Sequence, residues 1–203
     1  MTEAGASVPD GTEGGAGSAQ GLLDLIRARR SVRAHTGAPV PPHVLEALLE
    51  AARWAPTGGN RQRWCLVAVR EPLHIRKLAS VSPGLLGKPA ALVVICSDRR
   101  DPGGRSRELD EACSLIEVGM AAQNMMLLAS AWGLGSCPVR SFNPAAVGTL
   151  LHLPLGVEPE LIITLGYPAR PVRAPSRRPA EELFHREHFQ GRQEQEAAEG
   201  AQP

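Results

Sequence analysis

The chain has 203 residues and a formal net charge of +1, from 22 basic and 21 acidic side chains. That balance argues against a dedicated nucleic-acid-binding or membrane-surface protein, because such proteins carry a large excess of basic residues. Apolar residues make up 43% of the chain but aromatic residues only 3%. We therefore expect one domain whose core consists mainly of Leu, Val, Ile and Ala.

Both ends of the chain contain little that could be buried. Residues 1–19 are mainly Gly, Ala, Ser and Glu, and residues 190–203 are similarly polar. We predict a disordered tail over 1–19, a folded domain over 20–189 and a flexible tail over 190–203. The start lacks a signal-peptide pattern, no apolar run reaches membrane-spanning length, and the four cysteines are widely spaced. These features predict a cytoplasmic protein with reduced cysteines and no membrane partner.

The first half of the domain shows two helix patterns and two strand patterns. Apolar residues over 22–26 predict a first helix, and Pro41 and Pro42 then start a second one with apolar residues at helical spacing up to Ala52. Residues 64–69 (WCLVAV) and 91–97 (ALVVICS) have the composition of buried strands. A short helix is expected between these strands, over residues 73–80.

The second half begins with the longest helical pattern, over residues 109–132, which is apolar on nearly all sides and stops at Gly133. A short strand over 135–139, a helix over about 144–151 and a strand over 160–167 follow. Because helices and strands are interleaved, we predict an α/β or α+β sandwich with a central mixed sheet flanked by helices.

Several common sites are absent from the sequence. It contains no P-loop, no strand–GxGxxG–helix unit and no GxSxG motif, which argues against ordinary nucleotide folds and hydrolase triads. It also contains neither HExxH nor CxxC, and its six histidines are scattered, so we expect no metal site.

Four polar clusters stand at the ends of predicted elements. Arginines grouped around a hydroxyl suit an anion, because a guanidinium offers a planar fork of donors and keeps its charge. The first cluster has an ordinary explanation as well, since cations complement the dipole at the end of a helix. The clusters are RARRSVR (27–33), APTGGNRQRW (55–64), GLGSCPVRSF (133–142) and PSRRP (175–179).

Taken in this order, the four clusters resemble the nitroreductase family of FMN-dependent oxidoreductases, over about residues 22–185. The resemblance implies a homodimer with a four- or five-stranded mixed sheet, in which FMN lies at the dimer interface and contacts both chains. It also implies two-electron hydride transfer through flavin N5, with NAD(P)H as the reductant of a nitroaromatic or quinone.

The resemblance also implies which residues contact the cofactor. Arg33 would approach the pyrimidine edge of the flavin, and Asn60 would bond the ring, with Gln62 as a neighbouring candidate. The backbone N–H of Ser141 would point at N5, and Pro138 and Val139 would cover the same face. The phosphate would lie among residues of the first and last clusters, which are Arg29, Arg30, Ser31, Arg177 and Arg178.

Two positions depart from the family pattern. Arg63 stands where many relatives have Pro, and Arg140 stands where enterobacterial-type nitroreductases carry Glu. The role of Arg63 is open, and the charge reversal at Arg140 would change which substrate or nicotinamide is accepted. Residues 101–113 contain no Tyr or Lys, so the sequence names no substrate-side acid or base.

Two further alternatives stay open. The SPGLLGKPA and GLGSCPVRSFNP segments also resemble the catalytic subunit of cyclic dipeptide oxidases. That subgroup implies dehydrogenation of a small molecule with O2 as acceptor, in an assembly with a small partner protein. A flavin-binding subunit without its own turnover is the other alternative.

Overall fold

The computed structural model describes residues 13–100 and 107–189, and it divides the chain into two compact units that meet between Val172 and Arg173. The first helix, α1 (Glu13–Ala28), begins inside the stretch that we predicted to be a tail. Once a turn is formed, each added residue contributes one more hydrogen bond, so a helix started by the apolar residues 22–26 extends into polar sequence. Residues 1–12 and 190–203, where we predicted the remainder of the tails, lie outside the described residues.

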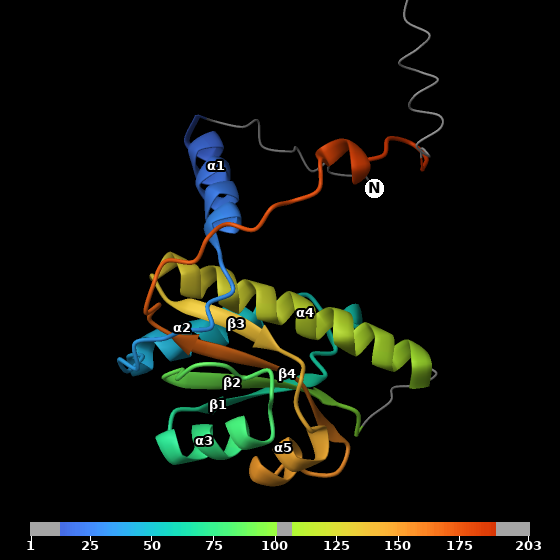
Figure 1. Ribbon diagram of the computed structural model, residues 1–203. Helices are drawn as coiled ribbons and strands as arrows, with labels where there is room; N and C mark the ends of the chain where they lie inside the picture. The colour runs from blue at the N-terminus through green and yellow to red at the C-terminus, as the bar shows by residue number, and fades with distance from the viewer. Residues whose placement is uncertain (1–12, 101–106, 190–203) are drawn as a thin grey trace, which may run out of the picture. The chain divides into compact units, whose positions relative to one another are not determined.

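The core of the first unit is a four-stranded sheet in the order β1-β2-β4-β3 (Figure 1). Its strands are β1 (Trp64–Val69), β2 (Ala91–Asp98), β3 (Gly135–Val139) and β4 (Val157–Gly166). The helices α2 (Pro42–Arg53) and α4 (Arg107–Ala131) cover one face, and α3 (Pro72–Ser80) and α5 (Pro144–Leu150) cover the other. The predicted α+β fold, with helices flanking a central sheet, is therefore confirmed.

The sheet differs from the prediction in strand direction. All three strand pairings are antiparallel, and the parallel pairing among the described residues is the isolated bridge between Ser31 and Ser136. Interleaved helices and strands are typical of parallel crossovers, which is why the sequence predicted a mixed sheet. Here α3 and α5 each join strands that run in opposite directions, whereas α4 joins β2 to β3, which run in the same direction but are separated by β4. Local sequence patterns do not encode that arrangement.

Strand β2 lies inside the sheet and is buried on both faces. Ala91, Val93 and Ile95 pack toward α2 and α4, whereas Leu92 and Val94 pack toward α3 and α5. This alternation follows from the two-residue period of a strand. Because both faces are covered, the strand reads as one continuous apolar run, as the sequence predicted.

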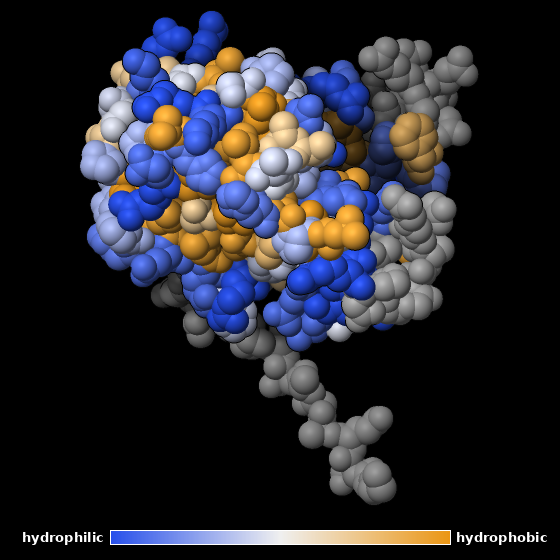
Figure 2. Space-filling view, turned by 90° about the horizontal axis from the view of Figure 1, so that it is seen from below, coloured by the Kyte–Doolittle hydropathy of each residue, from blue (hydrophilic) through white to orange (hydrophobic). Residues whose placement is uncertain are grey.

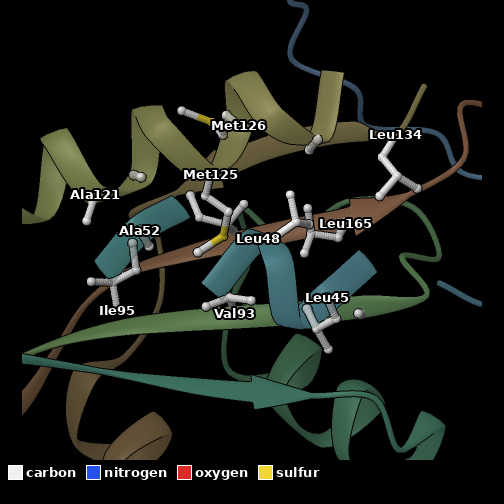
Figure 3. Close-up of a cluster of buried hydrophobic side chains, with 14 of the residues drawn as sticks. Leu45, Leu48, Ala52, Val93, Ile95, Ala121, Met125, Met126, Leu134 and Leu165 are labelled. Atoms are coloured by element: carbon white, nitrogen blue, oxygen red, sulfur yellow. The ribbon is translucent and has the colours of Figure 1, made fainter. Parts of the chain in front are cut away.

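Helix α4 is long and apolar enough, over Glu111–Ala131, to cross a membrane by length and composition alone. In the fold it acts as a core helix, since Ala121, Met125 and Ala129 are fully buried against α2 and the sheet. Figure 3 shows Met125 of α4 and Leu48 of α2 reaching into the same space next to the sheet. Burial explains the apolar residues on this face of the helix, whereas Leu115 and Ile116 on the same helix are exposed.

The opposite face of the sheet carries the thinner layer. Figure 2, which is seen from the side of α3 and α5, shows apolar groups interspersed with charged ones. Leu73 of α3 and the loop residues Leu86 and Leu155 are exposed. The apolar core beneath them holds Leu78, Leu92 and Val147, all of which are fully buried.

Candidate flavin site

The first and third sequence clusters lie side by side, although about a hundred residues separate them. The segment after α1 runs along β3, where the Val32 N–H donates to the Ser136 carbonyl oxygen at 2.9 Å and Ser31 forms a bridge with Ser136. Close packing requires glycine at position 135, because a Cβ there would lie 2.6 Å from the side chain of Val32. The structure therefore brings together Arg29, Ser31 and the start of β3.

We expect Gly135→Ala to displace this segment and to lower the free energy of unfolding by about 1–3 kcal/mol, the usual cost of overpacking. The added methyl group would have to push against the β-branched side chain of Val32. Thermal or urea unfolding measures the change. Gly119→Ala is the matched control, because nothing lies within 4 Å of its Cβ position on α4. The control should keep or slightly raise the stability, since alanine favours helices over glycine.

A pocket of about 220 Å³ opens beside this contact. Arg29, Arg30 and Arg170 contribute cationic side chains to its lining, and Ser136 and Gly133 lie on another wall. The Arg29 Nη1 atom is buried and has no hydrogen-bond partner among residues 13–100 and 107–189. A buried donor without an acceptor is costly. The three arginines give the pocket a cationic lining that suits an anion such as a phosphate.

Arg170 was not among the residues that the sequence analysis singled out. It follows the last strand in the stretch P-A-R-P. An isolated arginine in a loop carries no periodic signal. Only the return of the chain past β3 brings it to the wall of the pocket that Arg29 and Arg30 line.

The second cluster forms a tight loop that is fixed at several points. Gly58 N–H donates to Glu117 Oε1 at 2.8 Å, and the Gln62 N–H donates to Thr57 Oγ1 at 3.0 Å. Gln62 Nε2 donates to the side-chain oxygen of Asn60 at 3.1 Å. Glu117, a buried carboxylate on α4, was not predicted from the sequence, because nothing local distinguishes it from the other polar residues of that helix.

The same loop holds three residues in the left-handed backbone region. Gly59, Asn60 and Gln62 have φ angles of +66°, +53° and +51°. Glycine adopts this region freely and asparagine readily, but glutamine does so at a cost. The hydrogen bonds to Thr57 and Glu117 hold this arrangement and leave Asn60 and Gln62 exposed. A backbone restrained by these hydrogen bonds thus holds both side chains at the surface.

The third predicted contact segment follows the end of β3. Pro138 is exposed, whereas Val139 is buried in the core that α3 and α5 cover. The carbonyl oxygen of Ser141 accepts a hydrogen bond from the Gly84 N–H at 3.1 Å. No bond from the Ser141 N–H is recorded within the described residues. Pro138 and the backbone of Ser141 are therefore available to a ligand, but the side chain of Val139 is not.

Arg33, in the first cluster, interacts electrostatically with Cys137 in the third cluster. Its side chain is exposed and lies close to the Cys137 thiol on β3. Burial raises the pKa of Cys137, and the guanidiniums of Arg33 and Arg29 partly oppose that rise. Cys137 therefore stays a neutral thiol at neutral pH, beside the cations that line this part of the protein.

The two arginines that depart from the family pattern have structural partners. Arg140 Nη2 lies 3.6 Å from Glu160 Oε2, and its guanidinium stacks over the ring of Phe142 at 5.5 Å. Glu160 is buried and also accepts from Arg99 Nη2 at 2.8 Å. These contacts hold a cation beside the segment that contains Ser141.

Arg63 stands at the junction of the second cluster and β1. Its carbonyl oxygen accepts from the Asp98 N–H at 2.9 Å. The pKa of Asp98 is lowered mainly by its hydrogen bond with Arg100, and the charge of Arg63 adds a smaller contribution. Arg63 therefore helps to secure the loop to the end of β2, a role that the sequence did not reveal.

Arg177 and Arg178 belong to the unit that begins at Arg173, and both are exposed. A short 3-10 helix, η2 (Ala180–Glu182), follows them. Their predicted contact with the phosphate therefore stays a prediction. Of the phosphate residues expected from the sequence, the first unit by itself brings together Arg29, Arg30 and Ser31 near the start of β3.

Comparisons with known proteins agree with this architecture. The family model described as Nitroreductase family matches residues 26–86 and 81–167. The protein named NADH dehydrogenase of Thermus thermophilus is 30% identical over 171 residues, which cover 70% of this chain and 83% of that protein. The FMN reductase [NAD(P)H] of Bacillus subtilis is 24% identical over 184 residues, covering 83% of this chain and 74% of that protein.

Solved structures have the same fold. The crystal structure of a nitroreductase family protein from Clostridium difficile superposes with a TM-score of 0.70 at 28% sequence identity. The match covers 82% of this chain and 98% of that one. The residues matched by the family model, 26–167, include all four strands of the sheet and the helices on both of its faces.

Proposed function

Because the chain belongs to the nitroreductase family, we propose that it is an FMN-dependent oxidoreductase that passes a hydride from NAD(P)H to a small organic acceptor. Membership confirms the resemblance and the oxidoreductase class that the sequence predicted. It also confirms FMN as the cofactor at the level of the family. The observation that supports the proposal for this chain is a pocket lined by three arginines. One of them, Arg29, has a buried Nη1 atom without a partner in the described part of the chain.

FMN, when bound, supplies two-electron hydride chemistry at its N5 atom. The residues of this chain bind and orient it. Arg29, Arg30 and Arg170 would hold the phosphate by charge-assisted hydrogen bonds, with Ser31 beside them and Arg177 and Arg178 as the further predicted contacts.

The remaining predicted contacts would orient the ring. Asn60 and Gln62 would reach its polar edge from a loop whose backbone is already fixed, so little conformational freedom is lost on binding. Arg33 would place a positive charge near the pyrimidine, which favours the reduced, anionic form. Pro138 and Val139 would cover one face through the backbone of their segment, and the Ser141 N–H would donate toward N5.

The names of the relatives favour NAD(P)H as the reductant, since two of them are FMN reductases that use NAD(P)H or NADPH. Nitroaromatics and quinones are the acceptors that we propose. The sequence left two alternatives open. The first is dehydrogenation of a cyclic dipeptide with O2 as acceptor, and the second is a flavin-binding subunit without its own turnover.

We also propose that the protein works as a cytoplasmic homodimer. Helix α4 exposes Leu115 and Ile116, whose side chains are large and apolar, and such residues are commonly covered by a partner subunit. We expect a larger assembly with a small second protein only if the protein is a dehydrogenase of cyclic dipeptides.

The test is an anaerobic titration of the purified protein. The proposal expects a yellow protein with about one FMN per chain, whose flavin absorbance bleaches on addition of NADH or NADPH and returns on addition of a nitroaromatic or a quinone. A protein that does not take up FMN would contradict the proposal. Bleaching by a cyclic dipeptide but not by NAD(P)H would contradict the proposal and support the dehydrogenase alternative. Bleaching by neither compound would support the non-catalytic alternative.

A further inference from the structure

Two cysteines in the sheet face each other, and neither belongs to the proposed flavin site. In the pairing of β1 with β2, Cys65 lies directly opposite Cys96, between the pairs Trp64–Ser97 and Leu66–Ile95. Residues directly opposite in antiparallel strands have side chains on the same face. Both cysteines accordingly pack into the core on the side of α3 and α5.

This placement satisfies the spacing that a disulfide requires. Opposed residues of an antiparallel pair have Cα atoms about 4.5–5.5 Å apart, and disulfides join residues with Cα separations of about 4.4–6.8 Å. A bond between Cys65 and Cys96 therefore needs no rearrangement of the sheet. Side-chain rotation alone brings the two sulfur atoms into contact.

The two thiols also differ in the way that oxidation requires. Cys65 is half-buried on the edge strand β1, whereas Cys96 is fully buried on β2. The pKa of Cys65 is lowered to about 7, chiefly by a hydrogen bond with the neighbouring Cys96 thiol, and the pKa of Cys96 is raised by the same contact and by burial. A larger share of Cys65 than of an ordinary cysteine is thus thiolate at neutral pH, beside a protonated second thiol.

We propose that Cys65 and Cys96 form a reversible intramolecular disulfide on exposure to a hydroperoxide. The Cys65 thiolate attacks one oxygen of hydrogen peroxide, the O–O bond breaks, and after protonation one water leaves while Cys65 becomes a sulfenic acid. The Cys96 sulfur then attacks the Cys65 sulfur, the S–O bond breaks, and a second water leaves with the proton of the Cys96 thiol. Both sulfur atoms are oxidised, both peroxide oxygens are reduced to water, and a dithiol reductant reverses the change.

The other two cysteines provide internal comparisons. Cys137 is buried on β3 and its pKa is raised, so its thiolate is scarce at neutral pH. Cys113 lies on α4, which covers the opposite face of the sheet from Cys65 and Cys96. Neither has the combination of an opposed thiol, a half-buried side chain and a lowered pKa.

The test uses the full FMN-loaded protein, reduced with a thiol, freed of reductant and treated with one equivalent of hydrogen peroxide. Alkylation, intact mass and peptide mapping then follow. We expect the loss of two alkylatable thiols and one crosslinked peptide pair that contains Cys65 and Cys96, with full recovery after dithiothreitol. A sulfenic or sulfinic acid at Cys65 with no crosslink, or a crosslink to Cys113 or Cys137, would overturn the proposal.

Single variants separate the two steps. Cys96→Ser should stop at a sulfenic acid on Cys65 that dimedone captures, Cys65→Ser should leave Cys96 unmodified, and Cys113→Ser should crosslink as the parent does. Unchanged thiol loss in Cys65→Ser would contradict the order of events. If a variant fails to fold, the unsubstituted protein still tests the first step, which is the reaction of the Cys65 thiolate. The rate of alkylation of Cys65 should then rise with pH around a midpoint near 7. A midpoint at the ordinary value of about 8.5 would exclude the activated thiolate.

Discussion

Arg29→Gln should weaken FMN binding by about 10- to 150-fold, which corresponds to the loss of a charge-assisted hydrogen bond of about 1.5–3 kcal/mol. The reason is that Arg29 lines the proposed phosphate pocket, and its buried Nη1 atom has no acceptor among the described residues. Fluorescence titration of the flavin-free protein measures the affinity. Riboflavin, which lacks the phosphate, should bind the variant and the parent about equally.

Arg27→Gln is the matched control for this prediction. It removes the same charge two residues earlier, but Arg27 is exposed and pairs on its own helix with Asp24 at 3.6 Å. FMN affinity should therefore stay within about twofold of the parent, because an exposed pair of this kind contributes little. Equal losses in the two variants would indicate a general charge effect, and an equal loss for riboflavin would indicate damage to the ring site in place of the phosphate pocket.

Leu48→Ala should lower the free energy of unfolding by about 2–5 kcal/mol, the range for a fully buried leucine that leaves a cavity. Leu48 has no exposed surface and lies between α2, α4 and the sheet, next to Met125 (Figure 3). Urea unfolding followed by circular dichroism measures the loss. This loss would be a large share of the total free energy of unfolding, because typical domains are stable by only about 5–15 kcal/mol.

Glu46→Ala on the same helix provides the comparison for Leu48→Ala. Glu46 is exposed, so the same truncation to alanine should change the free energy of unfolding by no more than about 0.5 kcal/mol. Similar losses in both variants would mean that α2 is sensitive to any substitution. That outcome would contradict the assignment of Leu48 to the central core.

Much of the fold could be predicted because its elements have strong local patterns. The run at 91–97 became β2, and the helical pattern over 109–132 became α4. The start of β1 and the end of β3 were also located closely. The direction of the strands was not predicted, because hydrophobic periodicity records which face is buried and not how a strand pairs with its neighbours.

The contacts of the candidate site with a flavin stay a prediction. The clusters around Arg29, Asn60 and Ser141 were singled out because they contain recognisable motifs. Glu117 and Arg170 have no such motif, and only packing places them at the loop and the pocket. Val139 was expected to contact the flavin, but its side chain is buried in the core, so that contact is left to its backbone.

The sequence by itself determined the order of helices and strands, the family and the arginine-rich character of the site. The tertiary structure alone decided that Ser31 lies beside Ser136, that Arg170 joins Arg29 and Arg30, and that Cys65 faces Cys96. The physical reason is that periodicity and motifs are local properties of the chain. Contacts between distant segments depend on strand register and helix packing, which are set by the burial of all the apolar faces together.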